Sequence, residues 1–568
     1  MNVVFQFLFI NDMMELQKKH IWFLRITILL FVISYLFFLP QDVMDIDSTQ
    51  YAEIAREMIE NKNFLSLKDN GRKYLDKPIM TFWIISFFYS LFGISNFSYR
   101  LPATFMLLIS LFGIYKITKL TYQDKQKAWI ATLFYASSPA VFSMLTSPII
   151  DIYLTTFLIL TFLFYYYGIH EDPKYLYLMY LFIGIGFITK GPISLVIPLL
   201  SIFGNHLLKK DFETLKKIKL FSGFLIVFLI VGFWSFLLYL DFGIYGPYFF
   251  LYLQSFGRIT SKFYDTGWDP FYFYYTFLFS ILPFGLFFVL ITFQKLKEIY
   301  KNFQISYLEN KRFNEFYDFL FQKDRVLYLW CFLILFLLSF SKFRLPQYVF
   351  WLVPPASILS AHWFVESIHS KKHHSFWVVP FFLIVFLVYF RFFSEIEFHI
   401  VFSIFLLISI VILIYFHQVY SLGIRFTFIT VLLVYVYGIT SIYPFLVEYQ
   451  PASKMAKLIP PKKDSKEILF TYGIPYSHRS YAFYTQRLTR ALEIKKELFY
   501  QHLQNYQEAY IVVHYQLYEV FKNDFKDVEL HELGKFPFYK VSRPTWDFFE
   551  PKKRESKLQY VYLIKAIK

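Results

Sequence analysis

The sequence has 568 residues, of which 57% are hydrophobic and 23% aromatic, and it carries a formal net charge of +16. So high an apolar fraction excludes an ordinary globular domain, and a single cysteine, Cys331, excludes an intramolecular disulfide. Apolar runs of about twenty residues recur along most of the chain, which is typical of a polytopic α-helical membrane protein. The Lys and Arg residues lie mostly between these runs, so the charge does not indicate a nucleic-acid partner.

The apolar runs predict about thirteen transmembrane helices. The first run lacks a small-residue cleavage site and is expected to be an uncleaved helix. The apolar segment 79–92 is short for a crossing and is expected to lie at the membrane interface. The expected spans are approximately 21–40, 101–118, 128–147, 152–168, 175–189, 191–208, 219–240, 271–294, 326–341, 346–366, 375–392, 398–417 and 424–445.

The lysine-rich loops favour this number of crossings. With a cytoplasmic N-terminus, loops such as 116–127 and 209–219 fall inside, as the positive-inside tendency requires. Loop 41–78 and the short turn 148–151 then face outside. Residues 1–445 are expected to form the membrane domain, in which 41–78 is the first extracytoplasmic loop.

The tail, residues 446–568, changes from apolar runs to short alternating segments. These segments predict a small α/β domain on the extracytoplasmic side. It is expected to contain a helix over 491–504 and strands over Glu467–Tyr472, Ala509–Tyr515, Phe536–Val541 and Leu558–Ile564.

Loop 41–78 contains an amphipathic helix. Ser48 or Thr49 is expected to cap this helix with its hydroxyl. Its apolar positions are Tyr51, Ile54, Ala55, Met58 and Ile59, and its charged positions are Glu53, Arg56, Glu57 and Glu60. We assign Asp45, Tyr51, Glu53 and Asp76 to the part of the loop that contacts an acceptor.

Two acids are candidates for catalysis. Asp47, with Asp45 beside it, has the chemistry of a general base, because a low-dielectric boundary raises the pKa of a carboxyl into a useful range. Its alternative role is an acid favoured by the helix dipole. Asp151 stands alone before an apolar helix, where it is either functional or the N-cap of that helix.

Several cations lie at expected outer boundaries. Lys77 and Lys190 each precede a proline, directly or after one glycine, and can neutralise a phosphate or extend to the lipid headgroups. The turn 341–348 holds Lys342, Arg344 and the phenol Tyr348, and Arg344 suits bidentate phosphate binding. Arg258 is a further candidate, in a loop rich in aromatic residues. The sequence has no phosphate-binding glycine motif and no histidine spacing typical of a metal site, so neither a nucleotide nor a divalent metal is supported.

As a set, these segments resemble the lipid-linked-sugar glycosyltransferases of the GT-C superfamily, which include lipid A aminoarabinose transferases and dolichyl-phosphate-mannose protein mannosyltransferases (glycosyltransferase families 39 and 83). Order and spacing are similar across roughly residues 20–360. The chain departs from the family pattern at Ser48, Gln50 and Gln254. The matching segments are Asp47 with Tyr51–Met58, Tyr74–Pro78, Arg100–Pro102, Asp151, Thr189–Pro192, Arg344–Tyr348 and Pro354–Pro355.

The resemblance implies a polyprenyl-phosphate sugar donor and a lipid A, glycolipid or secreted-protein acceptor. It implies that Asp47 is the catalytic acid of the first loop and Asp151 the acid of the second. Lys77, Lys190, Arg344 and Tyr348 correspond to positions near the donor phosphate. The implied location is the inner (cytoplasmic) membrane, with the active site on the periplasmic side.

The expected reaction is a single inverting displacement, in which the cations stabilise the leaving phosphate. A polytopic transporter or a flippase of lipid-linked sugars is the alternative. Such a protein is expected to show symmetric halves or broken midplane helices.

Overall fold

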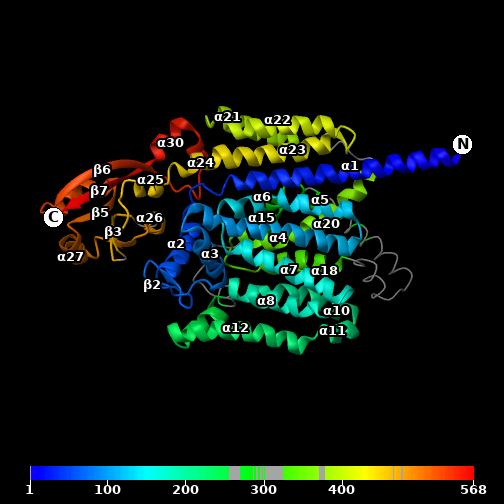
Figure 1. Cartoon of the computed structure of the whole chain (residues 1–568), viewed down its shortest axis with the longest axis horizontal. Helices are drawn as coiled ribbons and strands as arrows, with labels where there is room; N and C mark the ends of the chain where they lie inside the picture. The colour runs from blue at the N-terminus through cyan, green and yellow to red at the C-terminus, as the bar shows by residue number, and fades with distance from the viewer. Residues whose placement is uncertain are drawn as a thin grey trace.

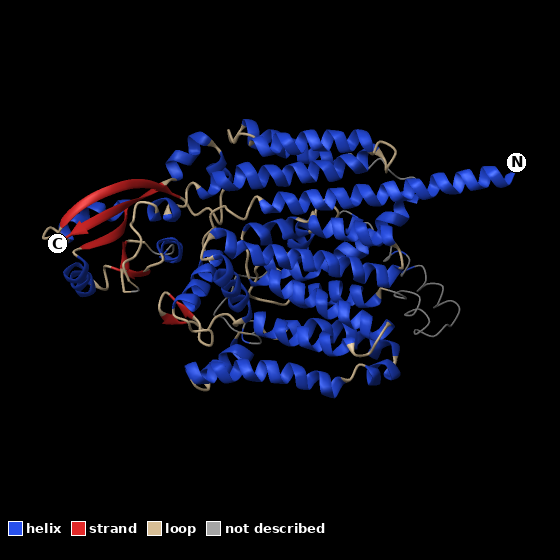
Figure 2. Cartoon of the chain, in the orientation of Figure 1, coloured by secondary structure: helices blue, strands red, loops and turns tan. Residues whose placement is uncertain are grey.

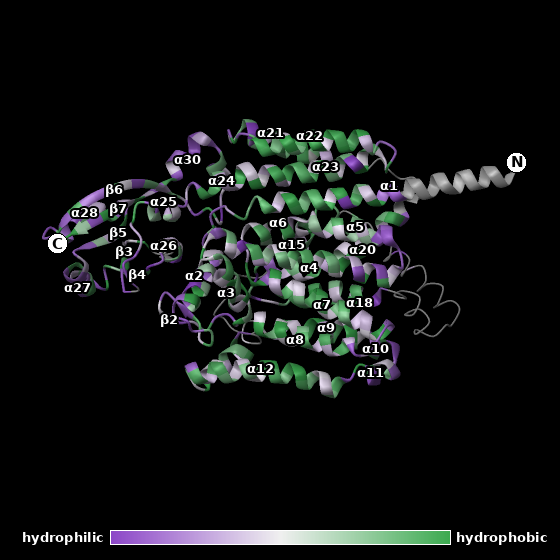
Figure 3. Ribbon diagram, in the orientation of Figure 1, coloured by the Kyte–Doolittle hydropathy of each residue, from purple (hydrophilic) through white to green (hydrophobic). Residues whose placement is uncertain are grey.

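The computed structural model describes residues 2–568 apart from 255–256, 258–268, 286, 290–291, 294–296, 298–299, 301–323, 370–377, 465 and 475–477. Long helices run roughly side by side, and a small sheet domain formed by the C-terminal part of the chain stands at one end of them (Figures 1 and 2). The helices are largely hydrophobic, whereas polar residues gather at the two ends of the bundle and in the sheet domain (Figure 3).

The bundle contains α-helices joined by short π- and 3-10 segments. Its described α-helices are α1 (Asn2–Leu36), α4 (Asn96–Tyr122), α5 (Lys125–Ala136), α6 (Pro139–Thr146), α7 (Ile150–His170), α8 (Tyr175–Lys190), α9 (Ile193–Pro198), α10 (Gly204–Lys209), α11 (Phe212–Lys217), α12 (Leu220–Phe242), α13 (Tyr245–Tyr248), α15 (Tyr272–Ser280), α18 (Arg325–Tyr328), α19 (Ile334–Leu338), α20 (Val353–His369), α21 (Val378–Phe392), α22 (Ile400–Tyr415), α23 (Leu422–Tyr437) and α24 (Tyr443–Val447). The short segments are η1 (Leu199–Phe203), η2 (Phe249–Leu253), η4 (Leu329–Leu333), η5 (Pro346–Leu352) and η7 (Gly438–Ile442).

Six helices in the described part of the chain are long and apolar enough to cross a membrane, or seven if one bent pair counts as a span. Every expected span overlaps a described helix, so the prediction of a polytopic helical protein is confirmed, but the count of thirteen is not. The other apolar helices have 10–17 residues. The bent pair, Lys125–Ala136 with Pro139–Thr146, turns by 49° because Ser137 and Ser138 separate two helices.

The two ends of the bundle differ in what they carry. The N-terminus and the lysine-bearing helices α10 and α11 lie at one end, and α2 (Asp47–Glu60), α3 (Met80–Phe92) and the sheet domain lie at the other (Figure 1). The loops that the sequence assigns to opposite sides of the membrane therefore fall at opposite ends of the structure.

Helix α2 is covered on both faces. Its apolar face packs on α3, where the Tyr51 and Phe82 rings meet edge to face with centroids 5.6 Å apart. On the other face the Arg56 guanidinium binds both oxygens of Glu53, with N–O distances of 2.5 and 2.7 Å, and donates to the backbone oxygen of Gln486 in the sheet domain at 3.3 Å. Glu53 and Arg56 are therefore buried, although an amphipathic pattern ordinarily predicts a solvated charged face.

The expected cap of α2 is wrong. The helix begins at Asp47, two residues earlier than a Ser48 cap implies, and has no side-chain cap. The Ser48 hydroxyl instead contacts that of Ser147 at 2.7 Å, and the Thr49 hydroxyl donates to the Asp45 carboxylate at 2.7 Å. Both hydroxyls have tertiary or local partners that the sequence pattern does not reveal.

Arg100 fixes the base of loop 41–78. Its buried guanidinium donates to the backbone oxygens of Asp42 at 2.6 Å and Thr146 at 2.5 Å, and to the Tyr443 hydroxyl at 2.6 Å. Three segments far apart in the chain are thus joined where the loop leaves the bundle.

The sheet domain has five described strands in the order β4-β3-β5-β7-β6. Strands β4, β3 and β5 are parallel to one another, and β7 is antiparallel to both of its neighbours, β5 and β6. The strands are β3 (Ile468–Tyr472), β4 (Leu488–Ala491), β5 (Glu508–His514), β6 (Glu529–Phe538) and β7 (Gln559–Ile567). The helical segments are α25 (Ala452–Ala456), α26 (His478–Thr485), α27 (Lys496–Tyr506), η8 (Tyr515–Leu517), α28 (Tyr518–Asp524), α29 (Trp546–Phe549) and α30 (Pro551–Lys557). In loop 41–78, β1 (Lys68–Asp69) and β2 (Arg72–Lys73) form a hairpin.

The expected strands Glu467–Tyr472, Ala509–Tyr515 and Leu558–Ile564 overlap β3, β5 and β7. Strand β4 was not expected, because its four residues are too few to show an alternating pattern. Strand β6 begins earlier than the expected Phe536, because its first half, at the exposed edge of the sheet, is rich in charged residues.

Candidate active site

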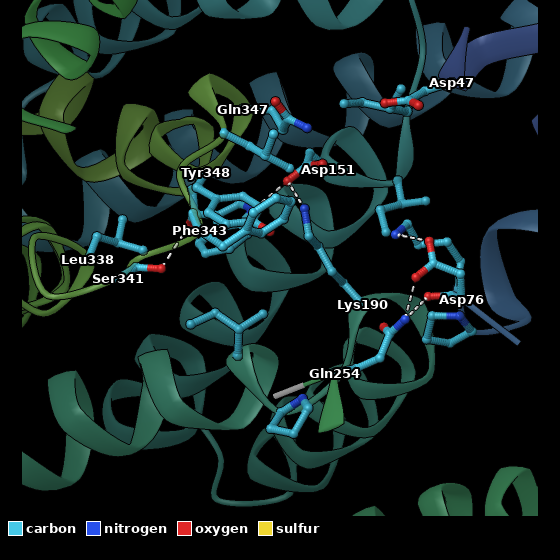
Figure 4. Close-up of a pocket in the computed structure, with 18 of the residues that line it drawn as sticks. Asp47, Asp76, Asp151, Lys190, Gln254, Leu338, Ser341, Phe343, Gln347 and Tyr348 are labelled. Atoms are coloured by element: carbon cyan, nitrogen blue, oxygen red, sulfur yellow. Dashed lines mark hydrogen bonds and ion pairs between the residues drawn. The ribbon is translucent and has the colours of Figure 1, made fainter. Parts of the chain in front are cut away.

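The candidate site is a cavity of about 910 Å³ at the end of the bundle that carries the sheet domain. Its wall comes from segments far apart in the sequence: the start of α2, the loop 76–78, the start of α7, the junction of α8 and α9, and the segment from α19 to η5. Figure 4 shows these side chains around a common space.

The structure brings together seven of the residues that the sequence singles out. Four others lie outside the cavity wall, namely Asp45, Glu53, Lys342 and Arg344, and Arg258 lies outside the described residues. The seven that line the cavity are Asp47, Tyr51, Asp76, Lys77, Asp151, Lys190 and Tyr348.

Lys190, the last residue of α8, forms an ion pair with Asp151 in the first turn of α7. The Trp351 indole nitrogen donates to the same Asp151 oxygen at 2.9 Å. The Lys190 ammonium lies 4.8 Å from the ring centroid of Tyr348 and 4.9 Å from that of Trp351, so it sits against two aromatic rings. Asp151 is in the first turn of α7 but does not cap it, because its carboxylate is only 1% exposed and is turned toward Lys190 (Figure 4).

A second pair, Asp76 and Lys77, lies on the opposite wall. The Lys77 ammonium is 2.6 Å from an Asp76 oxygen, and the Gln254 amide donates to the other Asp76 oxygen at 2.6 Å. Gln254 thereby attaches the segment after η2 to the first loop (Figure 4). Since this ion pair is partly exposed, an incoming anion can compete with Asp76 for Lys77.

Asp47 lines two cavities. Its side chain is exposed and, within the described ranges, has neither a hydrogen-bond nor an ion-pair partner. Besides the first cavity it borders a smaller one of about 490 Å³, whose lining includes Asp45, Lys540 and Arg543. Arg543 also lines both cavities, so a carboxylate of the first loop and a cation of the C-terminal segment share the boundary between them.

Asp45 faces the smaller cavity and the sheet domain. It accepts hydrogen bonds from Thr49 at 2.7 Å and from Ser480 at 3.0 Å. Burial raises the pKa of Asp45 to about 6, and these bonds together with the nearby Arg479 oppose that rise.

Arg344 and Glu53 are engaged elsewhere. The Arg344 guanidinium donates to the backbone oxygen of Asp269 at 2.9 Å and lies 5.6 Å from the centroid of the Tyr272 ring. Glu53 is held by Arg56, and Lys342 is exposed. The assignments of Arg344 and Lys342 to donor phosphate, and of Glu53 to the acceptor, therefore stay predictions without a place on the cavity wall.

One wall of the larger cavity is apolar and reaches the outer surface of the bundle. It is formed by Ile193 and Val196 of α9 and by Leu337, Leu338 and Phe340 at the end of α19. Leu337 is 42% exposed and Phe340 54% exposed. The cavity thus joins a charged end to an apolar slot whose Leu337 and Phe340 are exposed at the surface of the bundle.

Sequence reasoning missed Trp351, Gln347 and Arg543, and it noted Gln254 only as a departure from a family pattern. Trp351 lies in an apolar run, and Arg543 is one of many cations in the tail, so neither stands out by type or spacing. Among the described residues, no group of three His, Cys, Asp or Glu side chains is placed to hold a metal ion.

The fold defines a multi-span membrane protein. Its backbone superposes on the crystal structure of ArnT from Cupriavidus metallidurans bound to undecaprenyl phosphate, with a TM-score of 0.66, 14% sequence identity, and coverage of 95% of this chain and 97% of that one. The chain therefore has the fold of ArnT, as the sequence predicts.

The sequence comparisons cover parts of the chain to different extents. Residues 76–236 match the family model described as dolichyl-phosphate-mannose-protein mannosyltransferase. An undecaprenyl phosphate-alpha-4-amino-4-deoxy-L-arabinose arabinosyl transferase from Wigglesworthia glossinidia brevipalpis is 34% identical over 186 residues, which are 31% of this chain and 33% of the relative. An uncharacterized protein from Aquifex aeolicus (strain VF5) is 27% identical over 458 residues, which are 78% of this chain and 83% of the relative. The match thus spans about a third of the length of the curated transferase.

Proposed function

We propose that the protein is a membrane glycosyltransferase that moves a sugar from a polyprenyl-phosphate carrier to a glycolipid, such as lipid A, or to a protein. The observation that carries this proposal is the larger cavity, which joins an apolar slot to a wall bearing Asp47, Lys77 and Lys190. A carrier lipid has the same two parts, because its isoprenoid tail is apolar and its phosphate anionic. The curated transferase relative and the ArnT structure, both named with undecaprenyl phosphate, support the choice of carrier.

The donor lies with its tail between α9 and α19 and its phosphate near Lys77 and Lys190. These cations stabilise the negative charge that grows on the phosphate as the bond between the anomeric carbon and the phosphate oxygen breaks. The phosphate leaves with the electron pair of that bond. Asp151 and the two aromatic rings hold Lys190 in place before the donor arrives.

The acceptor approaches from the smaller cavity, on the other side of Asp47. Its hydroxyl or amine forms the new bond to the anomeric carbon from the side opposite the leaving phosphate, which inverts the configuration. Asp47 takes the acceptor's proton, and its exposed carboxylate is suited to this role because no described group occupies it. General-base assistance of this kind contributes about 10²–10⁴-fold to the rate.

We further propose that this chemistry takes place on the extracytoplasmic side of the inner membrane. The site lies at the end of the bundle opposite the lysine-bearing helices α10 and α11, which the positive-inside tendency assigns to the cytoplasm (Figure 1). The sheet domain lies on the same side as the site.

The test is a lipid and glycoprotein analysis by mass spectrometry of a strain that lacks the gene, complemented with the wild type or with Asp47→Asn. The wild type should restore a lipid or protein that is heavier by one sugar, and Asp47→Asn should leave it absent while the sugar-charged carrier accumulates. Glu171→Gln, an exposed acid at the C-cap of α7 far along the helix from the site, is the control and should behave as the wild type. Wild-type levels of product in Asp47→Asn would remove Asp47 from the mechanism, and equal levels of product with and without the gene would refute the transferase.

A further inference from the structure

A third cavity, of about 520 Å³, lies between the hairpin β1–β2 and the sheet domain. One wall is the hairpin segment 69–74. The other wall is formed by the ends of β3 and β4 and the residues that follow them, including Thr471 and Ala491. Its volume falls within the range of pockets that bind small ligands. It shares no lining residue with either cavity at Asp47.

The position of this cavity in the sheet favours ligand binding. Strands β4 and β3 are parallel, and their carboxyl ends, Ala491 and Tyr472, lie at the same edge of the sheet. In open α/β sheets, ligands bind in the crevice outside the carboxyl ends of the strands. Here the hairpin of the first loop closes that crevice.

The lining is strongly cationic. Among its described residues it has one carboxylate, Asp69, and five cations: Arg72, Lys73, Arg479, Arg490 and Lys495. Converging cations with little opposing charge attract an anion, and arginine side chains match the planar geometry of phosphate oxygens.

Protein groups neutralise only some of these cations. Arg479 pairs with Asp69 at 2.9 Å, and Lys73 pairs with Asp241 at 3.2 Å. Arg490 donates to the backbone oxygens of Asn70 and Thr489 and to the amide oxygen of Asn70, rather than to a carboxylate. The exposed side chains of Arg72 and Lys495 have no hydrogen-bond or ion-pair partner within the described part of the chain.

Two further observations favour a polar ligand for this cavity. The Tyr74 side chain lines the cavity and is only 9% exposed, yet its hydroxyl has no hydrogen-bond partner among the described residues. Burial, and then the positive charge of the nearby Arg72, lower the pKa of Arg490, and the Glu57 carboxylate opposes that shift. An anion beside Arg72 and Arg490 would offset the like charge of the two guanidinium groups.

The cavity is connected to the proposed active site through side chains. Gln50, which lines the larger cavity, donates to an Asp69 oxygen at 2.7 Å, and Arg479 binds the same oxygen. An anion that draws Arg479 away from Asp69 would change the surroundings of the Asp69 carboxylate, which accepts the hydrogen bond of Gln50. Gln50 lies three residues after Asp47 on α2.

We propose that this basic cavity binds a phosphate monoester group. If the transferase function proposed above is correct, this phosphate belongs to the acceptor, and the cavity anchors the acceptor while its sugar-accepting group lies near Asp47. The shared chemistry is the phosphate monoester, whether it is carried by a membrane lipid or by a water-soluble molecule.

The test measures binding to the full-length protein in nanodiscs of phosphatidylcholine. One arm titrates glycerol 3-phosphate, with glycerol as the uncharged comparison, and the other measures recruitment of labelled phosphatidic acid into the nanodisc-bound protein. The variant is Arg72→Gln/Lys495→Gln, which changes two exposed side chains and should leave the melting temperature unaltered. The matched control, Lys457→Gln/Lys526→Gln, removes the same charge from exposed positions of the tail outside the cavity.

The variant should lose at least about ten-fold in affinity for a phosphate probe, as expected for the loss of charge-assisted contacts, and the control should bind as the wild type. Loss for phosphatidic acid alone identifies a lipid headgroup, and loss for glycerol 3-phosphate identifies a water-soluble ester. Equal affinity of wild type, variant and control for both probes would overturn the proposal. These measurements need no sugar transfer, so binding at the cavity stands or falls separately from the transferase function.

Discussion

The ammonium group of Lys190 and the carboxylate of Asp151 are paired at the wall of the cavity, where the last residue of α8 meets the first turn of α7. Trp351 binds the same carboxylate, and its ring, with that of Tyr348, covers the ammonium. A buried ion pair of this kind has a clear consequence, because removing one partner leaves the other charge uncompensated.

Lys190→Met should therefore destabilise the protein by about 3–5 kcal/mol, because the Asp151 carboxylate, 1% exposed, loses its counter-charge. The double variant Asp151→Asn/Lys190→Met should recover much of this loss but stay inactive in transfer. The melting temperature in detergent measures the first effect, and product formation the second. Lys216→Met is the control. Both side chains of the Lys216–Glu213 pair are exposed, so the loss of this pair should hardly change the melting temperature. Equal stability of the single and double variants would contradict this account.

The attachment of α2 to the sheet domain through Arg56 gives a second prediction. Arg56→Met leaves the fully buried Glu53 without its bidentate partner, at a cost of about 3–5 kcal/mol. Glu53→Gln/Arg56→Met should lose less than the single variant, because no charge is then left buried. Thermal unfolding followed by tryptophan fluorescence checks the order of stabilities. Lys522→Met, which breaks an exposed pair with Glu519, is the comparison and should unfold as the wild type; the prediction fails if Arg56→Met does the same.

The raised pKa of Asp45 predicts a dependence of stability on pH. Because its pKa is about 6 when folded and 3.8 in the unfolded reference, the folded state binds more protons between these values. The contribution of Asp45 to the free energy of unfolding should therefore fall as the pH rises from about 4 to about 6, by up to about 3 kcal/mol. Asp45→Asn should abolish this fall, so the variant gains on the wild type as the pH rises. If the difference in melting temperature between Asp45→Asn and the wild type stayed constant from pH 4 to pH 7, the proposed contribution of Asp45 would be contradicted.

The apolar slot predicts an effect of tail length. Val196→Trp places a larger side chain in the apolar slot between α9 and α19, so it should raise the KM for an undecaprenyl-phosphate donor by about ten-fold. A farnesyl-phosphate donor has a shorter tail and should be affected less. Leu199→Trp, three residues further along and 39% exposed on the outer surface, is the matched control. Steady-state kinetics with the two donors separates these cases, and an equal effect of Val196→Trp on both would place the tail elsewhere.

The bundle was predictable because hydrophobic length is a strong signal, and each expected span overlaps a helix. The same signal cannot count crossings, since η1 after Pro198 and the bend between α5 and α6 divide apolar runs that look continuous in sequence. The sheet was only partly predictable, because β4 is too short and the first half of β6 too polar to show the pattern of a buried strand.

The candidate site was predictable where a charged residue interrupts an apolar boundary, as at Asp151 and Lys190. It was not predictable where the function of a side chain depends on what it meets. Arg344 has the chemistry of a phosphate ligand but contacts the Asp269 backbone and the Tyr272 ring. Arg543 reaches the cavity only because the tail folds back over the first loop, a contact between segments that no local pattern encodes.

The double coverage of α2 links the C-terminal domain to the chemistry. Arg56 joins one face of this helix to Gln486 of the sheet domain, and Tyr51 packs the other face on Phe82 of α3. A shift of the sheet domain or of α3 would therefore move α2 and, with it, the carboxylate of Asp47 at the first position of the helix. The C-terminal domain would then hold α2 in position, and removing it would displace the catalytic candidate at the start of that helix.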